Sequence, residues 1–206
     1  MSQLRQTPFG ATREPTWLDR FGIWLSARRI GALVKDPKGK RIGDFGCGYH
    51  AGIGRRFRGT AEHLVLVDLA LSPELKSDPG VTAIEGRLPE ALGRLGDASL
   101  DVIICNSVLE HLGAPQEAIG EFHRLLSPGG VCLINVPSWR GKWFLEFAAF
   151  RLGLSPAAEM DDHKAYYDPR DLWPLLVEAG FKPSRISCYR HKFGLNTFAV
   201  CRRGPA

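Results

Sequence analysis

Long apolar runs are missing from this sequence. Its 206 residues contain no uncharged apolar stretch of about 18 residues, the length that a membrane-spanning helix needs. Segment 1–13 also lacks the apolar core of a secretory signal. These two absences predict a cytoplasmic protein.

Cysteine is scarce and scattered. The chain has five cysteines, an odd number, and no two of them have the Cys-x-x-Cys spacing of zinc or redox sites. The sequence therefore argues against a disulfide framework and against a structural zinc ion. Buried thiols that pack as small hydrophobic groups are the expected use of these residues.

A strong charge of one sign is also absent. The 27 Lys and Arg residues exceed the 22 Asp and Glu residues only modestly, and the basic groups are dispersed along the chain. A nucleic-acid-binding protein usually concentrates such groups in a stripe or patch. Nucleic acid is therefore a disfavoured partner.

The composition that is present suits a globular core. The chain is 44% hydrophobic and 24% charged, close to the average of soluble proteins. Its length favours one domain over residues 1–206. Within it we expect an N-terminal helical segment over 1–39 and an inserted cap over 137–168.

Short segments rich in Val, Ile and Leu alternate with helical segments in the middle of the chain, which is typical of a parallel α/β sheet. The expected strands are 41–45, 64–68, 81–85, 100–105 and 131–136. Two later strands, 184–189 and 195–201, would close the sheet as an antiparallel hairpin. The predicted fold is a Rossmann-like, doubly wound α/β sheet of about seven strands, mostly parallel.

Helices are expected between and around these strands. The first should begin after Thr16, a suitable N-cap, and carry Trp17 and Trp24 into either the core or the substrate pocket. The sequence Ser-Pro-Gly-Gly at 127–130 should stop a helix and form a turn. The predicted helical segments are 15–34, 51–57, 89–95, 115–126 and 169–179, with an aromatic helical insertion over 139–154.

The most informative turn follows the first strand and reads Asp44-Phe45-Gly46-Cys47-Gly48. Glycines at this place in an α/β sheet let the backbone approach a ligand closely. The third glycine of a dinucleotide fingerprint is absent from its place, and an acid precedes the turn, which would repel a pyrophosphate. A ligand with a cationic group, such as S-adenosylmethionine, suits this turn better than NAD.

A second acid, Asp68, ends the second strand. A carboxylate at this position can accept hydrogen bonds from the two hydroxyls of a ribose. Acids at the ends of two successive strands favour a cofactor site over two unrelated helix caps.

With these features the chain resembles the class I S-adenosylmethionine-dependent methyltransferases, in particular the small enzymes that act on metabolites, lipids and sugars. The resemblance covers about residues 40–200. It is carried by the two acidic strand ends, by the segments 100–112 and 125–130, and by the late segments 162–167 and 176–181.

This resemblance implies S-adenosylmethionine as the cofactor and a role for each matching residue. Four residues would line its methionyl part, Asp68 would hold the ribose, Leu69 would flank the adenine and Asn106 would contact the cofactor from the fourth strand. The four methionyl-site residues are Asp44, Gly46, Cys47 and Gly48.

Two positions depart from the family pattern. His50 stands where a third glycine is usual, and Arg87 stands where an acid often meets the adenine amino group. The backbone groups of Arg87 and Leu88 would then contact the adenine edge instead, because main-chain N–H and C=O groups are retained whatever the side chain.

Methyl transfer to a hydroxyl is assisted by a base, and His111 and His163 are the two candidate catalytic residues. A structural role remains open for each. A metal site is not expected, because the acids near His163 suit a solvated loop. The aromatic insertion favours an apolar acceptor, and peripheral membrane contact with a lipid-linked substrate is a second interpretation.

The predicted function is therefore methyl transfer to a hydroxyl of a small apolar, glycosidic or lipid-linked metabolite. DNA methylation is disfavoured, because the fourth strand ends in Asn106-Ser107-Val108-Leu109 and lacks the Pro-Pro-aromatic turn that grips a base amine. The alternatives are an RNA or protein methyltransferase and a non-catalytic S-adenosylmethionine-binding protein. The oligomeric state is left open by the sequence.

Overall fold

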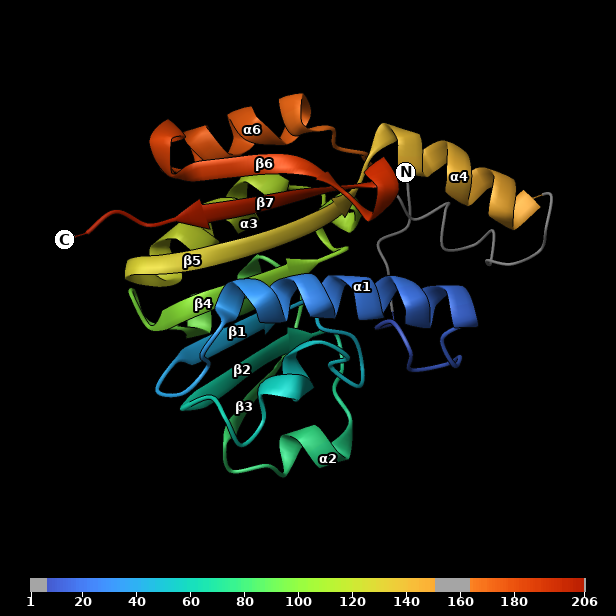
Figure 1. The fold of residues 1–206 in the computed structure, drawn as a ribbon. Helices are drawn as coiled ribbons and strands as arrows, with labels where there is room; N and C mark the ends of the chain where they lie inside the picture. The colour runs from blue at the N-terminus through green and yellow to red at the C-terminus, as the bar shows by residue number, and fades with distance from the viewer. Residues whose placement is uncertain (1–6, 151–163, 206) are drawn as a thin grey trace.

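Seven strands form one mixed sheet in the computed structural model, which describes residues 7–150 and 164–205 (Figure 1). The strand order is β3-β2-β1-β4-β5-β7-β6. Strands β1 to β5 are parallel, while β7 runs antiparallel to both β5 and β6. The strands are β1 (Arg41–Phe45), β2 (His63–Asp68), β3 (Val81–Glu85), β4 (Leu100–Asn106), β5 (Leu126–Pro137), β6 (Ile186–His191) and β7 (Asn196–Arg202). The predicted Rossmann-like sheet with its antiparallel hairpin is confirmed.

Helices cover both faces of the sheet, and each face has its own apolar cluster. Helix α1 (Trp17–Val34) lies across one face, where Ala27, Ile30 and Val34 pack on the strands. Helices α3 (Pro115–Leu125) and α6 (Pro169–Glu178) cover the other face. The strands β1 and β4 are apolar on both sides because both sides are buried.

Helix α1 begins at the predicted cap. The backbone N–H of Asp19 donates to Thr16 Oγ1 at 3.2 Å, and the backbone N–H of Thr16 donates to Asp19 Oδ2 at 2.8 Å. This reciprocal pair satisfies two backbone donors that the first helical turn would otherwise leave without partners.

Two segments that were predicted to be helices contain only short 3₁₀ turns. The segment 51–57 holds only the 3₁₀ turn η1 (Gly54–Phe57), and 89–95 holds only η2 (Glu90–Arg94). Ala51 has a positive φ of 45°, and Gly54 is pressed against the core, so the first segment cannot continue as an α-helix. The other short elements are α2 (Pro73–Lys76), η3 (Leu109–His111), η4 (Pro183–Arg185) and η5 (Lys192–Gly194).

The Ser-Pro-Gly-Gly segment stops helix α3 as expected, but it is part of β5 and does not precede it. Leu100 pairs with Leu126, and the register then shifts so that Val102 pairs with Val131. Gly129 has a φ of 80° at this irregularity. The predicted turn is therefore absorbed as a bulge, because the strand pairing resumes on both sides of it.

The expected insertion contains helix α4 (Trp139–Phe150), which leaves the end of β5 (Figure 1). Residues 151–163 of the predicted cap, which include His163, lie outside the described residues. Across 7–150 and 164–205, no helix is long and apolar enough to cross a membrane.

The capping pair generates a stability prediction. Thr16→Ala removes the side-chain acceptor for the N–H of Asp19, and we expect it to lower the free energy of unfolding by about 0.5–2 kcal/mol. Urea unfolding followed by circular dichroism measures this. Thr12→Ala, at an exposed position before the helix, is the matched control. Equal unfolding midpoints for the two variants would contradict the capping role.

Candidate functional site

A cavity of about 990 Å³ opens at the carboxyl ends of the parallel strands. This is the edge at which open α/β sheets bind their ligands. Segments after β1, β2, β3 and β4 form one side of the cavity, while α1, the start of α4 and the turn η5 form the other.

The turn after β1 is built from glycines for steric reasons. Gly46 and Gly48 have positive φ angles of 71° and 77°. A side chain on Gly46 would also collide with the methyl groups of Val108. The N–H of Gly46 donates to the carbonyl of Val67 at 2.7 Å, which fastens the turn to the neighbouring strand. The turn therefore brings bare backbone to the cavity wall.

Asp44, the last residue but one of β1, is a buried acid with 2% of its surface exposed. Its Oδ2 accepts a hydrogen bond from the backbone N–H of Gly54 at 2.7 Å. Burial raises the pKa of this carboxyl to about 7; the Gly54 hydrogen bond opposes the shift, and the nearby charge of Asp68 adds to it. A Cβ atom at position 54 would lie only 2.7 Å from Asp44 Oδ2, so the close contact requires glycine.

Asp68 joins the end of β2 to the glycine turn. Its Oδ2 accepts from the N–H of Gly48, and its Oδ1 accepts from the N–H of Leu69, both at 2.7 Å. The same side chain lines the cavity, as do Leu69 and the half-buried Cys47. The two acids predicted from the sequence thus face one cavity from adjacent strands.

The segment after β3 is joined to the end of β2. The N–H of Gly86 donates to the carbonyl of Asp68 at 2.9 Å, and Arg87 and Leu88 line the cavity next to it. Arg87 is exposed. Glu85 is not among the residues that line the cavity. Its Oε1 accepts hydrogen bonds from the N–H of Leu71 at 2.8 Å and from Lys76 Nζ at 3.1 Å.

At the end of β4, Asn106 is held in place by a buried neighbour. Its Oδ1 accepts from Asn135 Nδ2 at 3.0 Å, and both residues lie on adjacent strands. His111, the last residue of η3, is half-buried and lines the cavity. The structure therefore brings His111 to the same cavity as the two acids.

Lys192 and Phe193 line the cavity from η5, and the sequence contains no signal for them. Both have left-handed φ angles, 48° and 59°, which side-chain-bearing residues rarely adopt. Burial lowers the pKa of Lys192 to about 8, and the charge of Glu110 opposes this shift. Glu110 is itself buried and lines the cavity.

The N-terminal segment also reaches the site. The carbonyl of Phe9 accepts a hydrogen bond from the N–H of Tyr49 at 2.9 Å, and Pro8, Phe9 and Gly10 line the cavity. His50, which replaces the usual third glycine, has no positive φ. Its side chain therefore introduces no backbone strain and stands exposed at the cavity wall.

Two aromatic residues of α1 depart from expectation. Trp17 and Trp24 are neither in the core nor in the lining, and 65% and 44% of their surfaces are exposed. Their neighbours Leu18, Phe21 and Leu25 line the cavity instead. The helix is rotated so that Ala27 and Ile30 meet the sheet.

The fold and this cavity define a Rossmann-like α/β protein with a cofactor crevice at the carboxyl ends of its strands. Residues 19–185 match the family model of the methyltransferase domain, which is most of the chain. The chain therefore belongs to this family, the class I methyltransferases, whose cofactor is S-adenosylmethionine.

Two curated relatives illustrate the range of the similarity. A probable S-adenosylmethionine-dependent methyltransferase of Mycolicibacterium smegmatis is 32% identical over 120 residues, covering 57% of this chain and 41% of the relative. A ubiquinone biosynthesis O-methyltransferase of Burkholderia pseudomallei is 27% identical over 191 residues, covering 81% and 79%. Three of the matched curated relatives are spanned by this chain over only 37% to 41% of their length.

A solved structure agrees with the fold. The S-adenosylmethionine-dependent methyltransferase of Archaeoglobus fulgidus superposes with a TM-score of 0.64 at 14% identity, covering 88% of this chain and 94% of that one.

The raised pKa of Asp44 generates a prediction for the cofactor-free protein. The folded state holds this proton up to a pH of about 7, whereas an unfolded chain releases it near the ordinary value of 3.8. The ionised, buried carboxylate therefore costs stability as the pH rises through this window. We expect Asp44→Asn to become more stable than the wild type, by about 1–3 kcal/mol above pH 7, and to lose this advantage near pH 4.

Urea unfolding of both proteins at a series of pH values tests this expectation. Asp36→Asn, at an exposed position before β1, is the matched control. A stability difference between wild type and Asp44→Asn that stays constant with pH would contradict the raised pKa of Asp44.

Proposed function

We propose that this protein transfers a methyl group from S-adenosylmethionine to a hydroxyl of a small apolar, glycosidic or lipid-linked acceptor. The observation that carries the proposal is the pair of acids on adjacent strands, Asp44 and Asp68, joined through one glycine turn and facing one cavity. When bound, the cofactor supplies a methyl group activated by its sulfonium charge.

The buried acid fits the cationic end of this cofactor. Burial disfavours the ionised form of the Asp44 carboxyl, and a positive group beside it would favour that form. The bare backbone at Gly46 and Gly48, with Cys47 between them, allows a close approach of the methionyl part. The cavity thus suits a zwitterionic, cationic ligand at this end.

The opposite end of the crevice fits a nucleoside. In the proposal, Asp68 accepts from the ribose hydroxyls, and Leu69 flanks the adenine. A carboxylate accepts up to about four hydrogen bonds, so the two backbone contacts of Asp68 are compatible with this role. The backbone of Arg87 and Leu88 would meet the adenine edge, and Asn106, oriented by Asn135, would contact the cofactor from β4.

The acceptor would occupy the part of the cavity between α1, α4 and η5. Leu18, Phe21 and Phe144 line it with apolar surface, which favours an apolar acceptor and excludes water from the transfer. His111 faces this cavity, and we assign it the role of base that removes the hydroxyl proton. The similarity to a ubiquinone biosynthesis O-methyltransferase supports a hydroxyl on an apolar acceptor.

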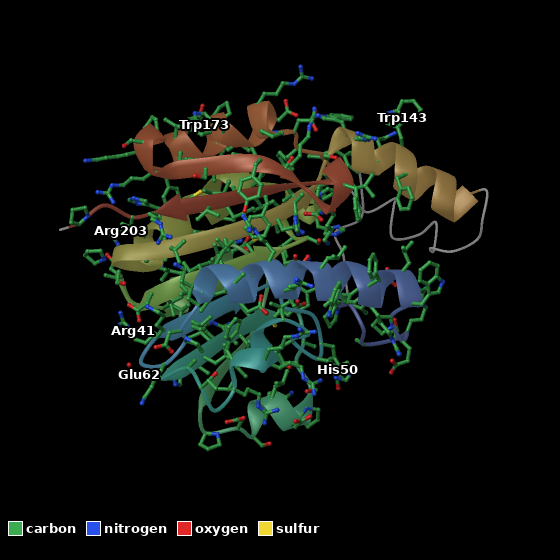
Figure 2. All side chains as sticks on the ribbon, in the orientation of Figure 1. Arg41, His50, Glu62, Trp143, Trp173 and Arg203 are labelled. Carbon is green, nitrogen blue, oxygen red and sulfur yellow. The ribbon has the colours of Figure 1, made fainter. Side chains whose placement is uncertain are left out.

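Calorimetry with S-adenosylhomocysteine, the demethylated product, tests the cofactor site. We expect one-to-one binding by the wild type and a loss of about 1–3 kcal/mol in Asp68→Ala, because a charge-assisted pair of hydrogen bonds is removed. Glu62→Ala is the control, since Glu62 lies at the other end of the sheet from His50 (Figure 2). Equal affinities for wild type and Asp68→Ala would contradict the ribose assignment.

A kinetic experiment tests the assignment of His111. With a hydroxylated apolar acceptor, His111→Ala should lower kcat by about 10²–10⁴-fold, the usual contribution of a general base, while leaving S-adenosylhomocysteine affinity unchanged. His63→Ala, at the first residue of β2, is the control. An unaltered kcat would make His111 a structural residue.

These measurements, together with RNA binding at several salt concentrations, separate the alternatives. A non-catalytic cofactor-binding protein would bind S-adenosylhomocysteine and methylate no acceptor. An RNA methyltransferase would bind RNA with an affinity that falls steeply with salt.

A further inference from the structure

Seven large apolar side chains are exposed among the described residues, and all of them lie in three segments. We call this set the aromatic rim. It consists of Trp17, Phe21 and Trp24 of α1, Trp139, Trp143 and Phe144 of α4, and Phe193 of η5. Trp143 and Phe193 are the most accessible, with 72% and 84% of their surfaces exposed. Soluble monomers rarely expose a large contiguous apolar patch without a binding function.

The aromatic rim adjoins the cavity. Phe21, Phe144 and Phe193 are exposed rim residues and also line the cavity. Helix α4 and the N-terminal half of α1 both project past the strands on the side of the strands' carboxyl ends (Figure 1). Any apolar molecule that enters the cavity from this side therefore passes the rim.

The three segments are fastened together. The N–H of Ser138, just before α4, donates to the carbonyl of Leu195, and its hydroxyl donates to the carbonyl of Gly194 at 2.8 Å. Lys192 of η5 lies against α1, with its Nζ 3.8 Å from the place that a side-chain carbon on Gly22 would take. The rim is therefore one surface supported by the fold and not three independent loops.

Packing against the sheet does not account for the α1 part of the rim. Trp17, Phe21 and Trp24 follow one another at helical spacing and form an exposed stripe. Phe21 and Trp24 stack on each other, with ring centroids 5.9 Å apart. A different side of the helix, with Ala27 and Ile30, already packs on the sheet. The helix thus has a second apolar face that is directed to the outside.

Basic side chains accompany the rim. The guanidinium of Arg28 lies 5.8 Å from the ring centroid of Trp24, and Lys142 Nζ lies 5.8 Å from that of Trp143. Arg140 is exposed at the start of α4. Two acids near the start of α1 are engaged locally: Glu14 pairs with Arg20, and Asp19 caps α1. Exposed aromatic rings beside basic groups suit the headgroup layer of an anionic bilayer, where rings enter the interface and cations meet phosphates.

We propose that the aromatic rim docks this protein onto the surface of anionic phospholipid membranes, with the mouth of the cavity against the bilayer. A bilayer is favoured as the occupant because the exposed rings lie beside basic groups, which matches the apolar interior and anionic phosphates of its surface layer. The docking rests on the rim residues and on the basic side chains beside them. Only its use, entry of an acceptor directly from the membrane, rests on the proposed function.

Vesicle flotation of the full chain tests the docking, with vesicles of phosphatidylcholine alone and of phosphatidylcholine mixed with phosphatidylglycerol. We expect binding to the mixed vesicles that weakens with salt, and little binding to phosphatidylcholine alone. Trp143→Ala and Phe193→Asn, which suits a left-handed backbone, should each weaken binding severalfold. Arg28→Gln should weaken it about fivefold.

Trp173→Phe is the control, because Trp173 lies on α6 and away from the rim (Figure 2). It should bind vesicles like the wild type. Circular dichroism checks that each variant is folded. Failure of the folded wild type to bind either vesicle, or rim variants that bind as tightly as the wild type, would overturn the proposal. A concentration-dependent dimer that Trp143→Ala abolishes would assign the rim to a second copy and also overturn it.

Calorimetry with S-adenosylhomocysteine on the same samples separates this proposal from the previous one. Cofactor binding without vesicle binding would contradict the docking proposal and remain consistent with the proposed methyl transfer. Vesicle binding without cofactor binding would support the docking and contradict the proposed methyl transfer.

Discussion

The candidate site depends on one hydrogen bond, which joins the end of β2 to the turn after β1. The carboxylate of Asp68 at the end of β2 accepts the backbone N–H of Gly48 in the turn after β1. This contact holds a turn whose positive φ angles exclude most residues, and it places backbone, carboxylate and the buried Asp44 around one crevice. The sheet supplies the frame for this, because parallel pairing of β1 with β2 brings both carboxyl ends to the same edge.

Titratable side chains line that crevice on both sides. On the proposed cofactor side are two acids, one of them with a pKa raised to about 7 by burial. On the proposed acceptor side are His111, the buried acid Glu110 and Lys192, whose pKa is lowered to about 8 by burial. A cationic ligand beside the acids and a hydroxyl beside His111 are complementary to this division. The aromatic rim extends the acceptor side outward to the surface.

Much of the fold could be predicted because its signals are local. Strand β1 and the N-cap of α1 were predicted at the positions where they occur, since an apolar segment ending in glycines and a Thr before a helical pattern act within a few residues. The segment 51–57 was predicted wrongly, because Ala51 adopts a positive φ of 45° and Gly54 is held against Asp44, ten residues earlier in the chain. The bulge in β5 depends likewise on pairing with β4.

By itself, the sequence determined the class of fold, the glycine turn, and the two acids near the carboxyl ends of β1 and β2, because each of these is a property of a short segment. The tertiary structure alone decided that Lys192 and Phe193 reach the same cavity, since they arrive from the C-terminal hairpin. It also decided that Trp17 and Trp24 face outward. Helical spacing shows that side chains share a face, but which face meets the sheet is set by packing of the whole helix against distant strands.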